Sequence, residues 1–368
     1  MDYSLEISKR KEKLLRTMHN LQVKSGNTLQ KTGPLLNRHR GMGMVTVQHL
    51  NHLSQTASQI CQDLENIENL VRFRQNDLMY EIENPGGVKS DGLSGIHCCL
   101  DGTTYIVSVS SPWVHVLNRS GQVFQSLYCI QNQGRSKEPF LPEDVTLTRA
   151  GMVAVTDMVG GVIRIFNPHS KFSEGEWIKI GKIDCPKGIG VDPSGKLLVA
   201  DYTAGKVHIF SIDHAFKVLN VQTVTGLRGP RYICSTYDGG IVVSEECGDV
   251  KVYGSNLKLM YSLGAKYCHQ FGNPAGVCTD PEGNIMVVDE QKRNVTLFPK
   301  CGSPICIVSA GLRTPTTLAC SSYGLLFVMD TGGNCIKVFK YRVAPYYASA
   351  KSGPSSYSPL ITPREKDS

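Results

Sequence analysis

The most regular feature of the chain is an order of apolar runs and turns that recurs between residues 142 and 341. Five copies begin with a proline, at Pro142, Pro186, Pro230, Pro274 and Pro315. Fifteen positions after each proline stands an acid, at Asp157, Asp201, Glu245, Asp289 and Asp330. An aromatic residue then closes a β-branched run such as "KVHIF", and the copies are 44, 44, 44 and 41 residues apart. A fixed period of this kind indicates a repeat architecture.

One repeat contains four short runs with the pattern of β-strands. In the copy at Pro186, "GIGVD", "LLVAD", "KVHIF" and "FKVLNVQTV" are apolar runs bounded by Gly, Pro or Asp. A sixth, degraded copy precedes the others, with Ser108 or Val109 in place of the acid and Leu117 in place of the aromatic. Four strands per repeat without helical periodicity predict a mainly β protein, a six-bladed β-propeller. The Gly-His and Trp-Asp signatures of a WD40 propeller are missing.

The predicted ring has to close, because an open ring leaves unpaired strand edges. The last repeat ends at Tyr341 without a good fourth strand. The segment "NDLMYEIENPGG", which begins at Asn76, matches the fourth strand and connector of the fourth repeat, "LKLMYSLG". We therefore expect residues 78–82 to be the outer strand of the last blade, within a propeller that spans residues 76–344.

Residues 1–75 have a helical pattern, with a coiled coil predicted at about residues 45–72. Its apolar seam alternates three and four positions apart, at Leu50, Leu53, Ala57, Ile60, Leu64, Ile67 and Val71. Such a short helix is marginal alone, so the seam either pairs with a second copy or a related coiled-coil protein, or packs against the propeller. Residues 345–368, rich in Ser and Pro, are expected to be disordered.

Composition narrows the functional classes. The 13 cysteines include no Cys-x-x-Cys pair, which favours reduced thiols over disulfides or a zinc site. No apolar run is long enough to cross a membrane, and the first residues lack the apolar stretch of a signal peptide. These features predict a cytoplasmic protein, with a nuclear location as the alternative, and no membrane partner. No nucleophile–base pair or phosphate loop stands out, so we predict neither a cofactor nor intrinsic catalysis.

The repeated acid has a structural and a metal-binding interpretation. A carboxylate that recurs at one place in every blade is explained by hydrogen bonds to the backbone N–H groups of the following turn, as in Asx turns. A metal site would need several His or carboxylate side chains that converge, and the histidines are scattered. The structural interpretation is favoured.

Strand alternation predicts that the proline corners and the loops after the acids lie on one face of the ring. Basic residues expected there are Lys187, Lys206, Arg228, Arg231, Lys292, Arg293 and Arg313. Acids expected there include Glu143, Asp144, Glu245, Glu246, Asp249 and Glu290. The net charge of +7 is concentrated outside the propeller, since residues 76–344 hold 25 basic and 24 acidic residues. This balance favours a protein client over RNA, which remains the alternative partner.

The repeat resembles the NHL repeat in its Pro-x-Gly corner, its Asp-x-x-Gly turn, the acid after the second strand and the closing Phe or Tyr. A coiled coil before six such repeats is similar to the C-terminal half of the tripartite-motif NHL proteins. That group is associated with E3 ubiquitin-protein ligases, and its propellers also bind RNA. Its ligases carry a RING, which needs about eight paired Cys or His ligands. Residues 1–75 offer only Cys61 and four unpaired histidines. The resemblance implies a protein-binding adaptor in ubiquitin-linked proteasomal turnover that borrows its ligase activity, for example from a RING-bearing partner.

Overall fold

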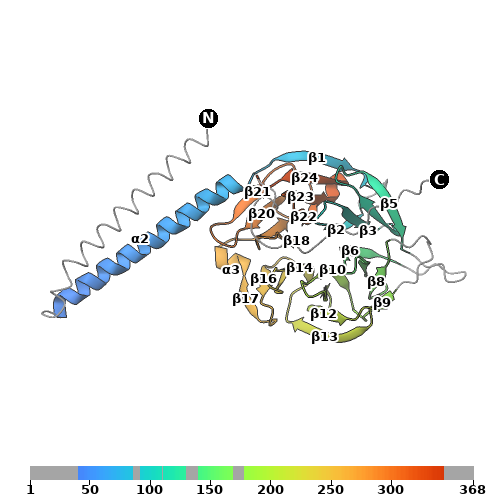
Figure 1. Ribbon diagram of the computed structural model, residues 1–368, viewed down its shortest axis with the longest axis horizontal. Coiled ribbons are helices and arrows are strands. Elements are labelled where there is room, and N and C mark those ends of the chain that lie inside the picture. The colour runs from blue at the N-terminus through green and yellow to red at the C-terminus, as the bar shows by residue number, and fades with distance from the viewer. Residues whose placement is uncertain (1–39, 86–91, 110, 130–139, 169–177, 344–368) are drawn as a thin grey trace, which may run out of the picture.

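The protein forms a ring of six four-stranded antiparallel sheets, with a long helix attached at one side (Figure 1). The computed structural model describes residues 40–85, 92–109, 111–129, 140–168 and 178–343. The first strands of neighbouring sheets contact one another around the centre of the ring. The prediction of a mainly β, six-bladed propeller preceded by a helix is confirmed.

Five blades are each built from four consecutive strands. Blade 1 contains β2 (Leu93–Cys98), β3 (Thr104–Ser108), β4 (Trp113–Leu117) and β5 (Val123–Tyr128). Blade 2 contains β6 (Pro142–Leu147), β7 (Val153–Asp157), β8 (Val162–Phe166) and β9 (Ile178–Ile180). Blade 3 contains β10 (Pro186–Val191), β11 (Leu197–Asp201), β12 (Lys206–Ile212) and β13 (Val218–Thr225). Blade 4 contains β14 (Pro230–Ser235), β15 (Ile241–Glu245), β16 (Val250–Tyr253) and β17 (Leu259–Ser262), and the short helix α3 (Leu263–Tyr267) follows it. Blade 5 contains β18 (Pro274–Thr279), β19 (Ile285–Asp289), β20 (Asn294–Phe298) and β21 (Ile305–Val308).

Blade 6 joins the two ends of the propeller. It contains β22 (Pro315–Cys320), β23 (Leu325–Asp330), the 3-10 turn η2 (Thr331–Gly333) and β24 (Cys335–Lys340), and its outer strand is β1 (Leu78–Glu83). β1 pairs antiparallel with β24 from Glu83 opposite Cys335 to Leu78 opposite Phe339. Residues 78–82 thus lie at the edge of the last blade, as their match to the fourth strand of the fourth repeat predicts.

The apolar core is divided among the spaces between blades. Six buried clusters each combine residues from two neighbouring blades. In one of them, Val107 and Val114 of blade 1 pack with Val145 and Val153 of blade 2. Because every sheet is covered on both faces, its second strand is a nearly continuous buried run rather than an alternating one, and all five residues of β7 are buried.

The helix α2 (Arg40–Arg72) leads away from the ring and contacts it through its last turns (Figure 1). Asn69 Nδ2 donates to the carbonyl oxygen of Cys301 at 3.0 Å, and Asn66 Oδ1 accepts from the N–H of Ser303 at 2.9 Å. Phe73, directly after the helix, is buried and stacks on Tyr341 with 6.4 Å between ring centroids. The end of α2 is therefore anchored between blades 5 and 6.

The predicted seam lies within α2, and the structure describes four of its side chains. Ile60 is buried, Leu64 and Ile67 are half-buried, and Ala57 is exposed. The side chains of Leu50, Leu53 and Val71 lie outside the described residues, as does the whole tail at 345–368. A single chain does not test pairing of this helix, so the coiled coil stays a prediction.

The repeated acid after the second strand holds each blade to the connector that enters it. Asp157 Oδ1 accepts from the N–H of Leu141 at 3.1 Å and from Gly160 in the following turn at 3.1 Å. The turn contact matches the structural interpretation of the acid. The connector contact is the more regular of the two, because it recurs at Asp201, Glu245, Asp289 and Asp330.

A polar side chain in the middle of the third strand faces the same acid in four blades. Arg164 Nη2 lies 2.5 Å from Asp157 Oδ2, and both side chains are at most 1% exposed. His208, Lys251 and Lys337 occupy the corresponding positions and contact Asp201, Glu245 and Asp330 at 3.1, 2.8 and 3.2 Å. Blade 5 has Thr296 in this register position instead. The acids therefore act as internal structural groups in the blades.

Removal of β1 is expected to destabilise the whole propeller. A chain that begins at Gly86 lacks the pairing with β24 and the buried Ile82 side chain, so we expect its free energy of unfolding to fall by at least about 3 kcal/mol. Urea unfolding followed by tryptophan fluorescence measures the loss. A chain that begins at Cys61 is the control, since it retains β1 and the anchored end of α2. Equal unfolding midpoints for the two truncated chains would contradict the closure role.

The buried ion pair of blade 2 makes a second prediction. Asp157→Asn leaves the Arg164 guanidinium buried without this counter-charge, so we expect a loss of about 3–5 kcal/mol in the free energy of unfolding. Asp289→Asn is the matched control, because neutral Thr296 stands in the cation position and only hydrogen bonds weaken, at about 1–3 kcal/mol. Thermal and urea unfolding give both values, and similar losses would count against the ion pair.

Candidate functional site: the loop face and the central cavity

The candidate interaction surface is the face of the ring that carries the proline corners and the loops between the second and third strands, here called the loop face. The first strand of every blade begins there and the second ends there, because the strands are antiparallel. All seven basic residues predicted for this face are in these corners and loops or in the strand ends next to them. In the structure, two of the seven form ion pairs and five do not, among the residues described.

Two of the seven are engaged in ion pairs within the face. Arg231 Nη1 lies 2.8 Å from Glu290 Oε2, and the arginine side chain is 14% exposed. Lys187 Nζ lies 4.0 Å from Glu143 Oε2 and 5.0 Å from the centroid of the Tyr202 ring. Burial raises the pKa of Glu143, and the charges of Lys187 and Arg231 oppose that rise. These two cations are largely neutralised by their own surface.

The other five cations have no ion-pair partner among the residues that the structure describes. They are half-buried Lys206 and exposed Arg228, Lys292, Arg293 and Arg313. Lys292 Nζ donates to the carbonyl oxygen of Gln270, and Arg293 has φ 55° in its loop. Glu246, in the loop of blade 4, accepts a hydrogen bond from the Tyr202 hydroxyl. After internal pairing, five cations of the loop face have no ion-pair partner among the described residues, and they lie beside acids such as Glu246 and Asp249 in the loop of blade 4.

Tyr232 closes the centre of the ring on the side of the loop face. Its hydroxyl donates to the carbonyl oxygen of Ser94 at 3.3 Å. Tyr232 lies near the start of the first strand of blade 4, and Ser94 lies near the start of the first strand of blade 1. These two blades are opposite each other in the ring, so the Tyr232 side chain spans the axis. Burial, followed by the charge of Asp144, raises the pKa of Tyr232. The Tyr232 side chain therefore lies between the centre of the loop face and the interior of the ring.

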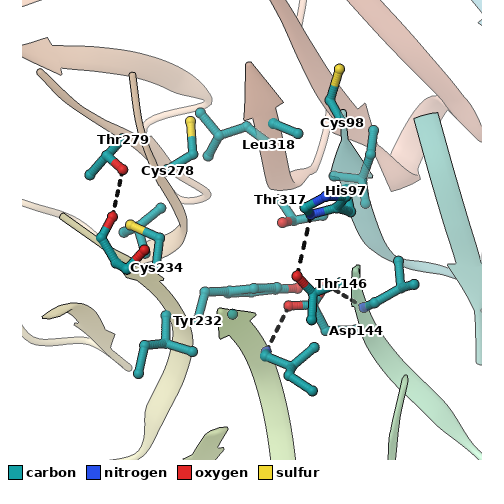
Figure 2. Close-up of a pocket in the computed structure, with 18 of the residues that line it drawn as sticks. His97, Cys98, Asp144, Thr146, Tyr232, Cys234, Cys278, Thr279, Thr317 and Leu318 are labelled. Atoms are coloured by element: carbon teal, nitrogen blue, oxygen red, sulfur yellow. Dashed lines mark hydrogen bonds between the residues drawn. The ribbon is translucent and has the colours of Figure 1, made fainter. Parts of the chain in front are cut away.

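Behind Tyr232 lies a cavity of about 210 Å³ lined by the first strands of all six blades (Figure 2). His97 Nδ1 lies 3.4 Å from Thr146 Oγ1, and burial lowers the pKa of His97 to about 4. Burial raises the pKa of Asp144 to about 7. The N–H groups of Ile189 and Val145, which donate to its two carboxylate oxygens, act in the opposite direction and lower the pKa. Near neutral pH the imidazole is uncharged, and the carboxyl group titrates.

The opposite end of the cavity is held by hydrogen bonds between blades. Ser235 Oγ donates to the carbonyl oxygen of Val191 at 2.9 Å, and Thr279 Oγ1 donates to that of Ser235 at 2.7 Å. Cys320 Sγ continues the series to Thr279 at 3.5 Å. The pKa of the neighbouring Cys278 thiol is raised by its hydrogen bond with Cys320 and by burial. Cys278 is therefore a protonated thiol that packs in the cavity wall.

Metal binding has no geometric support in the described part of the chain. Residues 40–85, 92–109, 111–129, 140–168 and 178–343 contain no group of three or more His, Cys, Asp or Glu side chains arranged to hold a metal ion. All 13 cysteines are free thiols. Within the same residues, no helix has the length and apolar character to span a membrane.

Sequence reasoning expected Asp144 among the acids of the loop face and did not single out Tyr232; both shape the centre of the ring, where Asp144 is buried in the wall of the cavity. Asp144 and Tyr232 stand two positions after the proline of their repeats, where Gly188 and Gly276 stand in the third and fifth blades. A Cβ atom at Gly188 would lie 2.6 Å from Tyr232 Cα, so glycine is required where the inner strands touch. The second and fourth repeats depart from the Pro-x-Gly corner at these two positions, and this departure could have identified both residues from the sequence.

Comparisons with known proteins agree with the repeat. No family model matches the chain. Over 119 residues it is 50% identical to NHL-repeat-containing protein 4 of Mus musculus, which is 32% of this chain and 88% of that protein. Over 223 residues it is 23% identical to E3 ubiquitin-protein ligase TRIM32 of Homo sapiens, which is 56% of this chain and 34% of the ligase.

Among solved structures, a luciferin-regenerating enzyme matches 73% of this chain and 98% of its own, with a TM-score of 0.53 and 15% identity, a likeness of fold alone. The match to NHL-repeat-containing protein 4 is much closer, and it covers nearly all of that relative. The repeat spacing, the six blades and this identity lead to one conclusion: the chain belongs to the family of NHL-repeat-containing proteins.

Proposed function

We propose that this protein is a non-catalytic adaptor whose loop face binds a protein client that presents acidic side chains. The proposal rests on the observation that some cations on that face form ion pairs and others do not. Lys187 and Arg231 are paired with Glu143 and Glu290, whereas five further cations project without an ion-pair partner among the described residues. Unpaired surface cations attract acidic partners and increase the rate of encounter.

The side chain at the centre of the ring favours a broad contact over capture of a small molecule from this side. Tyr232 spans the axis below the loop face and so stands between the proposed client surface and the cavity behind it. A protein surface can instead rest across several blades and meet cations from the connector before blade 4, the loop of blade 5 and the connector before blade 6. Arg228, Arg293 and Arg313 supply these three contacts.

The biological context proposed for the adaptor is ubiquitin-linked protein turnover in the cytoplasm. Support comes from the relatives, because two of the proteins that share this propeller sequence are named E3 ubiquitin-protein ligases, TRIM32 and NHLRC1. In this proposal α2 joins the propeller to a RING-bearing partner or to a second copy. The anchored end of α2 supports that role, since Asn66, Asn69 and Phe73 fix the direction in which the helix leaves the ring.

Charge reversal on the loop face is expected to weaken client binding. In Arg228→Glu with Arg293→Glu, two exposed cations become anions, so we expect at least about a tenfold loss of client recovered from cell lysate. The measurement is affinity capture with the full-length protein, followed by quantitative mass spectrometry. We expect the same clients with and without RNase, together with a RING ligase.

The matched control is Lys217→Glu with Lys258→Glu, which makes the same change of charge in turns on the opposite face. Client recovery should be unchanged in this variant. Equal losses in both variants would remove the loop face as the client site. Specific RNA, partners lost on RNase treatment and a steep decrease of affinity with salt would establish RNA binding in place of the proposed function.

A further inference from the structure

The outer strand of blade 3 differs from the other strands at the rim of the propeller. β13 has eight residues, against three in β9, four in β17 and β21, and six in β1 and β5. Its sequence, "VLNVQTVT", contains no charged residue, proline or glycine. Propellers normally leave short edges, and proteins protect exposed edges with charges, prolines or bulges.

The edge of β13 is also regular in register and open. Six consecutive pairs join it to β12, from Lys206 opposite Thr225 to Ser211 opposite Asn220, and the register shifts only beyond them. β13 is the terminal strand of its sheet, so no strand of the described chain pairs with its outer edge. Leu219 and Val221, on one face of the strand, are 67% and 43% exposed. β5 is uncharged too, but it is shorter, and Gln125 within it donates to the carbonyl oxygen of Pro168 in blade 2.

We infer that β13 is a docking edge for β13 of a second copy of this chain, in antiparallel register about a twofold axis at Val221. The backbone N–H and C=O groups along an open strand edge form hydrogen bonds with another strand. The occupant of this edge is therefore expected to be a β-strand. A twofold contact must be complementary to itself. β13 meets that requirement because an uncharged strand brings no like charges together.

The side chains match in this register. Leu219 of one copy lies opposite Thr223 of the other, and Val221 lies opposite its own counterpart, which places apolar side chains together on one face. On the other face Asn220 lies opposite Gln222, two amides that can exchange hydrogen bonds. Lys217, the nearest charge before the strand, falls opposite Thr225. The product is one eight-stranded sheet that is continuous through two propellers.

This contact goes beyond the proposed adaptor function and leaves its surfaces free. Blade 3 is opposite blade 6 in the ring, and Figure 1 shows β13 on the side away from β1 and from the end of α2. The outer edge of β13 lies at the rim, apart from the loop face. Client binding and helix pairing can therefore continue in the paired state.

The test is charge substitution at the twofold axis, measured by sedimentation velocity on the full-length protein over a concentration series. Val221→Lys places two lysines opposite each other, and Val221→Glu places two glutamates there. Each variant alone should raise the dissociation constant of self-association by at least about tenfold. An equimolar mixture should restore association, because the lysine of one copy then faces the glutamate of the other at the axis. Leu259→Lys is the control on β17, whose residue is 55% exposed, and should change nothing.

Several results would overturn the inference. They are a wild-type chain that stays monomeric, variants that associate as the wild type does through α2 or another surface, and variants that fail to associate on mixing. Hydrogen exchange supplies a measurement that needs no substitution. The amides of β13 should exchange more slowly as the concentration of the wild-type chain rises, whereas those of β17 should not. An unchanged rate in β13 would exclude the paired edge.

Discussion

The antiparallel ladder between β1 and β24 is the interaction on which the rest of the propeller depends. Every apolar cluster lies between two blades, so each sheet is stable only when both of its neighbours are in place. The ladder is where the N-terminal and C-terminal ends of the ring meet. Ile82 extends this junction into the core, where it packs with Ile336 and Val338. The same junction carries Phe73 and the end of α2, so closure of the ring also orients the helix.

Polar groups connect the blades in a second way. Each repeated acid accepts hydrogen bonds from the connector that enters its own blade, and its burial explains why most blades place a basic or imidazole group beside it. Near the axis, hydroxyl and thiol groups donate to carbonyl oxygens of the preceding blade. The repeated carboxylates, which could have been taken for a ring of metal ligands, therefore stabilise the fold. The side chains that a partner can contact lie at the surface.

That surface is a set of loops on a rigid frame, which is the usual arrangement for binding. The propeller as a whole is close to neutral in composition, and ion pairs within the face engage Lys187 and Arg231 with two acids. A partner therefore meets the five remaining cations together with acids such as Glu246. Sequence similar to parts of this propeller occurs in E3 ubiquitin-protein ligase TRIM32 and in NHL-repeat-containing protein 4. An adaptor with separate client, helix and rim contacts is consistent with both settings.

The sequence by itself determined the number of blades, the strand order within each blade and the origin of the closing strand. These features follow from local spacing, because a strand pattern and its turn residues repeat with each blade and "LKLMYSLG" has a counterpart at residues 78–82. The tertiary structure decided which of the predicted cations are paired, since Arg231 and Glu290 are 59 residues apart in the chain. It also decided that Tyr232 of blade 4 reaches Ser94 of blade 1, a contact across the axis that no local pattern encodes. Blades are specified by neighbours in sequence, whereas the face and the centre of the ring are made by residues that meet only after it closes.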